Sequence, residues 1–478
     1  MSLGSDFLGG NYGKNLFKQL QETIVTVEKL SAEISDLKKN QRAEIEMLNQ
    51  KIESQAAEII ALKTENQKLK DIINKDSGNS DKPPSSDGFK KIYNSREKTG
   101  KRPGGQSGHT GFVPKLHSNP TRTVEIKCKK CHCGGEIRYS GKYTAKQFVD
   151  ISIAADITEY REYEGTCDCC QNKAENHAPI NDIITYGNNL KGLSGILTIE
   201  GCVSINRTQQ MISELTGGLI NVSEGTIVKW NKELAIRVAP AIENIKENLI
   251  ISPVLNKDET GVRVDKTINW FHVLSNKTHT LYHVNKKRGN EADKEMGVLP
   301  SYSGVLIHDH LKGLYNFTCE HAECNAHILR YLKAAIENKK RSWAGDMIKL
   351  LIEAKDGMAV NLVFQRYDEV LERGRQEFLK DESPDYNGDD MKLLRRMEKY
   401  KQEHLRFAAD KNVPFDNNQA ERDLRMIKAK TKISGCFRGN DKGTVFATLK
   451  SYTSTLRKNN CNIFNGIKSA FDSNPIFC

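Results

Sequence analysis

Three carboxylates occupy settings that suit ligands of a divalent metal: Asp258, Asp309 and Glu421. Asp258 lies in PVLNKDETGVRV, where an apolar run turns polar and then resumes, and Asp309 follows the short apolar run in GVLIHDH. Glu421 lies in PFDNNQAERDLRMIK, just after an Asn-rich helix start. Acids at the ends of two strands and on one later helix can converge around two divalent cations, which activate a water and stabilise the leaving oxygen of a phosphodiester. The pattern indicates phosphoryl transfer on nucleic acid, with surface charges as the alternative for each acid alone.

The neighbours of Glu421 favour a site over a surface helix. Asn417 and Asn418 precede the helix and are expected to cap it or to contact DNA. Arg422 and Arg425 share the helix with Glu421 and can fork to phosphate oxygens, although a plain Glu–Arg surface pair stays open.

His308 and His310 flank Asp309 and raise the alternative of zinc-dependent hydrolysis. Alternation along a strand directs these side chains away from the face of Asp309, so this alternative is disfavoured.

The elements that must position the three acids form an α/β pattern from residue 252 onward. SPVLNKDETGVRV, NWFHVLSN and HTLYHVNKK predict three successive strands, followed by a helix from Asn290 and a fourth strand at GVLIHDH. A helix is expected through AECNAHILRYLKAAIENK, and the end of the chain reads as helical apart from the turn GCFRGNDKG. We predict a catalytic core in two parts, 251–334 and 412–478, separated by a helical insertion over 335–411.

Composition bounds the class of protein. A chain of 478 residues is too long for one ordinary core, so several domains are expected. No stretch approaches the apolar run that a membrane span requires, and the first residues lack an export signal. We therefore expect a cytoplasmic protein whose 12 cysteines are reduced thiols or metal ligands.

The net charge of +11 is concentrated in two segments. Residues 82–130 hold 12 Lys and Arg against 3 Asp and Glu, and residues 421–458 hold 10 against 3. Such segments commonly meet phosphate backbones, although Lys-rich surfaces can simply aid solubility. Residues 76–122, rich in Pro, Gly, Ser and Lys, are expected to form a flexible basic linker that lies along DNA, which suggests association with the nucleoid.

Residues 14–75 predict one long helix with a coiled-coil seam. Apolar residues recur at alternating steps of three and four, with a phase break between Gln41 and Ile45. Asn66 falls at an a position of the seam, where a buried Asn favours a parallel dimer in one register. We expect a homodimer, with a single helix folded against its own domain as the alternative.

Residues 123–185 hold two cysteine clusters, CKKCHC and CDCC. Cys128, Cys131, Cys167 and Cys170 form two C-x2-C pairs that suit a structural zinc site closed by four sulfurs. His132, Cys133 and Cys169 leave the exact ligand set open, and unliganded thiols are the alternative. The segment between the clusters alternates like strands and is expected to form a hairpin.

Residues 186–250 predict several helices, the last beginning after Ser223 as N-cap. The arrangement is compatible with a helix-turn-helix whose last helix enters the major groove near Lys229 and Lys232. The GGLINV connection is longer than the usual tight turn, so an ordinary helical packing unit is an equal alternative.

The motifs taken in order resemble those of transposases of the insertion-sequence-66 group, over nearly the whole chain. The matching features are KPPSSD at 82–87, RPGGQSGH at 102–109, the cysteine pairs, DET at 258–260, CNAHILR at 324–330 and DNNQAER at 416–422. The resemblance implies a DDE enzyme with an RNase H-like core in which Asp258, Asp309 and Glu421 are the three acids. Such cores carry the first acid on the first strand, the second on the fourth strand and the third on a later helix.

The same resemblance implies a leucine-zipper-like N-terminal region, a zinc-binding segment and binding to the terminal inverted repeats of a mobile element. Cys324, His327 and Arg330 carry over from the CNAHILR motif without an assigned role. The expected cofactors are two catalytic Mg²⁺ ions and a structural Zn²⁺, and the expected partners are double-stranded element ends and target DNA. Two alternatives stay open: a DNA-binding regulator without catalysis, and an RNase H-like nuclease that only hydrolyses.

Overall fold

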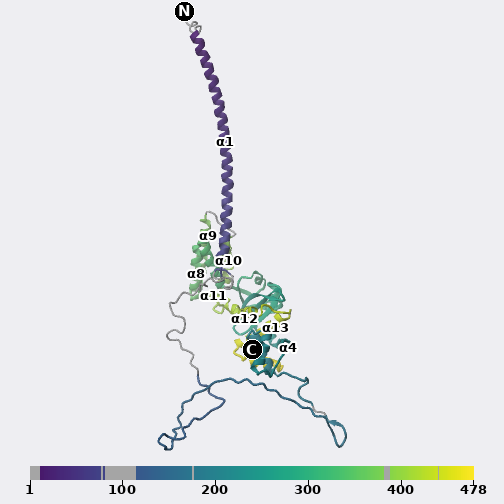
Figure 1. The fold of residues 1–478 in the computed structure, drawn as a ribbon. Helices are drawn as coiled ribbons and strands as arrows, with labels where there is room; N and C mark the ends of the chain where they lie inside the picture. The colour runs from purple at the N-terminus through teal and green to yellow at the C-terminus, as the bar shows by residue number, and fades with distance from the viewer. Residues whose placement is uncertain are drawn as a thin grey trace. The chain divides into compact units, whose positions relative to one another are not determined.

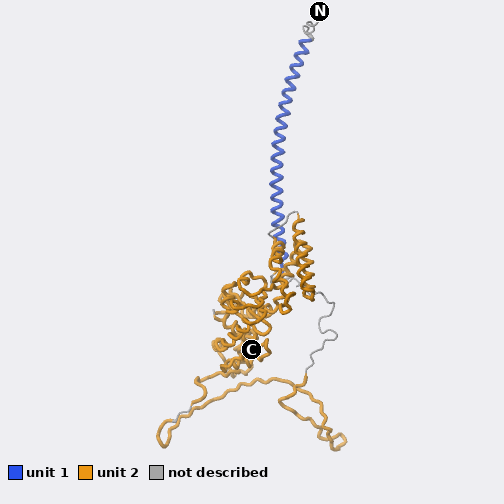
Figure 2. The backbone as a smooth tube through the Cα atoms, turned by 180° about the vertical axis from the view of Figure 1, so that it is seen from behind, with its two compact units in different colours: residues 1–77, 81–90 blue, residues 78–80, 91–478 orange. Residues whose placement is uncertain are grey.

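The computed structural model describes residues 11–76, 79–80, 115–174, 177–381, 388–439 and 441–477. The chain forms two compact units, one of Met1–Ser77 with Asp81–Lys90 and the other of Gly78–Ser80 with Lys91–Cys478 (Figure 2). The motifs KPPSSD and RPGGQSGH, with most of the expected linker 76–122, lie outside the described residues.

The first unit is built on a single helix, α1 (Asn11–Ile73), of 63 residues (Figure 1). The segment contains no proline, and its many Leu, Glu, Lys and Gln residues lose little side-chain freedom in a helix. Seam residues such as Leu30, Leu48 and Leu62 are more than half exposed in the single chain. Among the helices of the described residues, none is long and apolar enough to span a membrane.

The cysteine segment has little regular structure. Two strands of two residues each, β1 (Gly165–Thr166) and β2 (Lys173–Ala174), pair antiparallel around the second cysteine cluster. The strands expected between the clusters are wrong for residues 138–164, all of which are described and none of which enters a ladder. Their apolar side chains, Phe148 and Ile151 among them, are exposed, so no apolar core packs against this segment to stabilise strands.

Four helices follow in the second unit: α2 (Asn188–Gly195), extended by the π-helical turn η2 (Ile196–Glu200), then α3 (Ile205–Leu215), α4 (Glu224–Arg237) and α5 (Ala239–Ile250). Ser223 caps α4 as predicted, because its hydroxyl accepts the N–H of Thr226 at 3.1 Å. Ser204 caps α3 in the same way through Arg207.

A mixed five-stranded sheet lies at the centre of the second unit. Its strands are β3 (Val254–Val264), β4 (Thr267–Ser275), β5 (Thr280–Asn285), β6 (Val305–His308) and β7 (Glu320–Glu323), in the spatial order β5-β4-β3-β6-β7. The first three strands pair antiparallel, while β6 and β7 run parallel to β3. Three short helices connect them: α6 (Asn290–Glu295), η3 (Leu299–Ser301) and η4 (Lys312–Asn316).

The predicted strand order is confirmed up to the fourth strand, and the fifth was missed. Residues 322 and 323, expected at the start of a helix, end β7 instead, and the helix begins only at Asn325. β7 is short and reads EHAE, so neither its length nor its composition marks a strand. Its pairing with β6 is a tertiary effect.

Helices cover both faces of the sheet. On one face, α12 (Asn418–Ser434) and α13 (Lys442–Lys458) pack through Leu424 and Phe446 against Val262, Phe271 and Val273. On the other face, Ile245 and Leu249 of α5 pack against inward-facing leucines of β3, β4, β5 and β6. The last helix, α14 (Ile463–Phe471), packs with α13 and with helices α2 and α4.

A helical insertion separates β7 from α12. It contains α7 (Asn325–Lys339), α8 (Ser342–Lys355), α9 (Val360–Leu379), α10 (Asp389–Lys399) and α11 (Lys401–Ala409), of which α8 to α11 lie together in Figure 1. The insertion has its own apolar core around Trp343, Met347 and Tyr367. Ile328 and Leu332 of α7 belong to this core, so the insertion begins before residue 335.

Candidate active site

Asp258 lies within β3, level with the end of β6, and Asp309 directly follows β6. β3 pairs with β6 through Val254 with Val305 up to Asn256 with Ile307. Continued by two residues, this register sets Asp258 beside Asp309, which directly follows the end of β6. Residues in register on two parallel strands lie side by side, so the two carboxylates lie at the same level of the sheet.

The same alternation assigns Asp258 to the face of the sheet that α12 covers. Asp258 shares its parity along β3 with Val262 and Val264, both of which pack with α12 in one apolar cluster. Lys257 and Glu259 point to the other face, toward Asp293 of α6. Asp258 and the helix that carries Glu421 are therefore on one side of the sheet.

Burial, together with the nearby charges of Asp309 and Glu259, raises the pKa of Asp258 to about 7. The N–H of Glu259 donates to Oδ1 of Asp258 at 2.8 Å and opposes this shift. Two half-buried carboxylates in mutual repulsion form an anionic site. A divalent cation beside them would favour the ionised form of both.

Glu421 stands in the first turn of α12, and this turn is bonded to the strand of Asp258. The side chain of Asn417 donates to the carbonyl of Lys257 at 2.7 Å and accepts from Nδ2 of Asn256 at 2.9 Å. The backbone N–H of Glu421 in turn bonds to the carbonyl of Asn417 at 3.3 Å. These bonds attach the start of α12 to β3 at Lys257, the residue before Asp258.

Cys324 connects the third acid to the second. Its backbone N–H donates to the carbonyl of His308, the residue before Asp309, at 2.9 Å. Its thiol accepts the N–H of Asn417 at 3.2 Å, and the charge of Glu421 contributes to its raised pKa. Cys324 therefore contacts the residue before Asp309 and lies within the electrostatic reach of Glu421.

Cys324 also explains part of the CNAHILR motif. Burial raises the pKa of its thiol to about 12, so the neutral thiol is the acceptor for the Asn417 N–H. Asn325 bonds to Phe415 through its backbone and to the carbonyl of His404 through its side chain. His327 is buried and Arg330 half-buried. The start of the motif docks the segment leading to α12 against the end of β7.

Carboxylates are the ligand type that Mg²⁺ prefers, and it binds through one or two of them while it retains several waters. Asp258 and Asp309 are two such groups, and Glu421 lies on the adjacent helix. Across the described ranges, no three His, Cys, Asp or Glu side chains are gathered closely enough to hold a metal ion.

The residues expected to contact DNA differ in their settings. Asn417 is buried with both amide atoms bonded inside the protein, which favours its structural role. Asn418 is half-buried, whereas Arg422 and Arg425 are exposed, and Arg422 donates to Oε1 of Gln419 at 2.8 Å.

On α4, Lys229 is exposed. Lys232 forms an ion pair with Asp441 at 2.5 Å, so the two lysines expected near a major groove are not equivalent.

Two buried polar clusters flank the acids, and the sequence analysis missed both. In the first, Nζ of Lys257 lies 3.2 Å from Glu259 Oε2, 3.3 Å from Asp293 Oδ1 and 3.1 Å from His272 Nδ1. The carboxylates of Glu259 and Asp293 raise the pKa of Lys257 against the effect of burial. The only available signal was a lysine inside an apolar strand.

The second cluster is centred on Glu323 at the end of β7. Its carboxylate accepts from the Tyr315 hydroxyl at 2.6 Å, bonds to Nε2 of His404 at 3.0 Å and pairs with Arg396 and His310. Hydrogen bonds from the two histidines, with the charges of His404 and Arg396, hold the pKa of Glu323 well below its usual range. The cluster joins the chain after Asp309 to α10 and α11.

The two histidines that flank Asp309 have partners of their own. His310 bonds to Glu323, and Nε2 of His308 lies 3.2 Å from Nδ1 of His321. Both rings therefore form hydrogen bonds to other side chains of the protein at the edge of the sheet.

The six clustered cysteines are exposed, and the four expected zinc ligands do not form one group in the described residues. Locally, the Cys167 sulfur accepts the backbone N–H groups of Cys170 and Cys169, which lowers its pKa. Hydrogen bonds from the N–H of Gly135 and the thiol of Cys131 lower the pKa of Cys133 in the same way. Such N–H···S bonds favour thiolates, the form that zinc requires.

The chain matches two known protein families. Residues 198–445 match the Transposase IS66 family, and residues 30–114 match a family of unknown function (DUF6444). No curated protein matches the chain. The first match spans more than half of the chain and includes all three acids and the sheet. The protein therefore belongs to the IS66 family of transposases.

Proposed function

We propose that the protein is a DDE-type transposase that cuts and joins DNA strands with Asp258, Asp309 and Glu421, on an RNase H-like core. The observation that carries the proposal is the β3–β6 register, which sets Asp258 beside Asp309. The strand order β5-β4-β3-β6-β7 supports the core assignment, since the acids then fall on the first strand, after the fourth strand and on a helix that follows an insertion.

In this proposal each acid has a role that its position supports. Asp258 and Asp309 present carboxylate oxygens from a rigid sheet edge, and Glu421 approaches from the first turn of α12. Two magnesium ions bound by these acids would activate the attacking water or hydroxyl and stabilise the leaving oxygen. Asn417 keeps the helix in place relative to the strand.

The proposed chemistry has two steps. Water first cuts the donor strand at the element end and frees a 3′-hydroxyl. This hydroxyl then attacks a target phosphodiester in line, so that a new P–O bond forms as the target strand's own 3′-oxygen leaves. No covalent bond to the protein is formed. Arg422 and Arg425 are exposed on the helix of Glu421 and are proposed to bind the DNA phosphates.

Binding of the element ends is proposed for α2 to α5, with α4 as the helix in the major groove. Lys229 is available for this contact, while Lys232 must first exchange its partner Asp441. The basic segments 82–130 and 421–458 would add contacts to the backbone.

The cysteine segment is proposed to hold a structural zinc, with Cys128, Cys131, Cys167 and Cys170 as the expected ligands. The N–H···S bonds at Cys167 support a thiolate there, and the contact of Cys133 with Cys131 offers Cys133 as a replacement for Cys128. The α1 helix is proposed to pair two chains, because dimerisation would cover its exposed seam.

The direct test incubates the full-length protein with labelled element-end DNA, target DNA and Mg²⁺. We expect nicked and joined products with the native chain, and neither with Asp258→Asn at unchanged end binding. Asp356→Asn, at an exposed acid that directly follows α8, is the matched control. Cleavage without joining would favour a nuclease, and binding without cleavage would favour a regulator. Full activity of Asp258→Asn would remove this residue from the site.

A further inference from the structure

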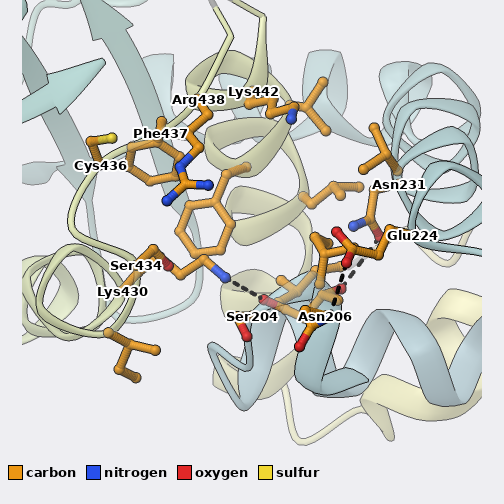
Figure 3. A pocket seen from close by; sticks show the side chains of 18 of the residues that line it. Ser204, Asn206, Glu224, Asn231, Lys430, Ser434, Cys436, Phe437, Arg438 and Lys442 are labelled. Carbon is orange, nitrogen blue, oxygen red and sulfur yellow. Dashed lines mark hydrogen bonds between the residues drawn. The ribbon is translucent and has the colours of Figure 1, made fainter. Parts of the chain in front are cut away.

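A cavity of about 480 Å³ lies outside the acidic site, between the first turns of α3 and α4 and the segment that joins α12 to α13 (Figure 3). Its volume is in the range of small-ligand sites. Figure 3 shows side chains from all of these elements around the space. None of the three acids lines it, and of the side chains proposed one by one to contact DNA only Lys232 does.

The lining is strongly positive. Four cations, Lys232, Lys430, Arg438 and Lys442, face one carboxylate, Glu224. Glu224 already accepts a hydrogen bond from Asn206 at 3.0 Å. Arg438 is exposed and forms no ion pair within the part of the chain that the structure describes. Lys442 adjoins Asp441, whose carboxylate is engaged by Lys232.

Lys430 is the cation with the least compensation. Its half-buried ammonium donates to the carbonyls of Val203 at 3.2 Å and of Cys202 at 3.4 Å, both neutral groups. It also lies 5.6 Å from the ring centre of Phe446. Burial lowers the pKa of this amine. An anion in the cavity would supply the counter-charge that the described carboxylates do not.

The rest of the lining suits a body larger than a simple anion. Apolar side chains form much of the wall, namely Ile199, Ile205, Val228, Ile433, Val445 and Leu449. Ser204, Asn231 and Ser434 add neutral hydrogen-bonding groups. The cations suit a phosphate group, and the apolar side chains and neutral hydrogen-bonding groups suit the sugar and base attached to it.

The cavity is linked to the acidic site by α12. Lys430 follows Glu421 by nine residues on this helix. At 1.5 Å per residue the separation along the axis is roughly 14 Å, or about four base steps of DNA. Arg425, Lys428 and Lys432 are exposed along the same helix. Lys430 lies about half a turn around α12 from Glu421, so a DNA strand along the face of Arg425 and Lys428 would have to pass around the helix to reach the cavity.

We propose that this cavity binds a nucleotide, with Lys430, Arg438 and Lys442 around its phosphate and the apolar wall beside its base. The nucleotide is either a unit of the DNA strand that runs along α12 or a free mononucleotide. The first source rests on the proposed transposase function, whereas the second does not.

The test measures binding of 2′-deoxyadenosine 5′-monophosphate to the full chain by calorimetry, at low salt and with a chelator so that no catalysis occurs. Each charge-assisted hydrogen bond contributes on the order of a tenfold change in affinity, so the double variant Arg438→Gln/Lys442→Gln should bind at least about tenfold more weakly. The matched control, Lys349→Gln/Arg395→Gln, removes two exposed charges from the insertion and should bind as the native chain does.

Competition identifies the source. Displacement of the mononucleotide by unlabelled element-end DNA assigns the cavity to the DNA strand, and continued binding beside that DNA assigns it to a free nucleotide. Inorganic phosphate should compete weakly in either case. Asp258→Asn should bind the mononucleotide normally, which separates this proposal from the catalytic one. Absence of mononucleotide binding, or binding that the Arg438→Gln/Lys442→Gln variant leaves unchanged, would overturn it.

Discussion

The side-chain amide of Asn417 donates to the backbone carbonyl of Lys257 at 2.7 Å, one residue before Asp258 on the central strand. The same amide accepts from Asn256 at 2.9 Å, and the backbone of Asn417 bonds to the thiol of Cys324. One buried residue thus joins β3, the end of β7 and the helix that carries Glu421.

Asn417→Ala should therefore lower both stability and activity. It leaves a buried amide and a buried carbonyl without partners, which costs about 2 kcal/mol of unfolding free energy. Urea unfolding measures the loss, and strand transfer reports the displaced Glu421. Asn418→Ala removes a half-buried side chain next to it and should change stability by less than about 0.5 kcal/mol. Equal effects of the two variants would contradict the assigned role.

Asp258→Asn should inactivate the protein yet stabilise it without metal. The pKa of Asp258 is raised from 3.8 to about 7, so in the native chain ionisation of this acid opposes folding progressively as pH rises between these values. The variant should match the native chain near pH 4 and exceed it by on the order of 2 kcal/mol at pH 8, in chelator. Thermal unfolding across pH measures the difference. A variant that is less stable at every pH would contradict the mutual burial of the two acids.

Glu323→Gln should destabilise the junction between the sheet and the insertion. A carboxylate paired with Arg396 and two histidines is lost, and disruption of a buried ion pair costs roughly 3 kcal/mol. Because the pKa of Glu323 is lowered from 4.5, its contribution is complete above that pH and is lost as the pH falls through the lowered value. Denaturant unfolding at pH 7 and pH 3 should show the larger difference at pH 7.

Glu320→Gln is the control on the same strand. Its pair with Arg406 is exposed, so its loss should cost less than about 1 kcal/mol. If Glu320→Gln destabilises the chain as much as Glu323→Gln, the Glu323 cluster has no special role.

Cys167→Ser should abolish zinc binding if the cysteine segment holds a structural zinc. The sulfur of Cys167 accepts two backbone N–H groups, which lower its pKa and favour a thiolate. Metal content of the purified chain measures the result, with loss of zinc expected on substitution. Cys461→Ser, a half-buried cysteine outside the clusters, should retain the metal. Zinc-free native protein that is still folded and active would refute the proposal.

Leu48→Lys/Leu62→Lys should convert a dimer into a monomer. Both leucines belong to the apolar seam of α1, and two charges there would face the same charges on the paired chain. Light scattering gives the mass. Gln50→Lys/Thr64→Lys adds the same charges to the outer face of the helix and should leave the dimer intact. A native chain that is monomeric at all concentrations would remove the basis of this prediction.

Local patterns in the sequence were sufficient to predict the helices and strands whose formation depends on residues close together in the chain. The heptad periodicity on either side of the phase break specified α1, and the Ser223 hydroxyl followed by a helical pattern specified the start of α4. The apolar runs around Asp258 and Asp309 specified β3 and β6, because strand formation there depends on residues within the run. The identity of the three acids was proposed from the same local settings.

The tertiary structure decided what depends on partners distant in sequence. β7 exists because β6 pairs with it, and the expected strands between the cysteine clusters are absent because no core faces them. Asn417 could be read as a DNA contact until its partners on β3 were known. Cross-strand register, the buried cluster at Glu323 and the basic cavity follow from how elements far apart in the sequence pack, and no periodicity within one element encodes those distances.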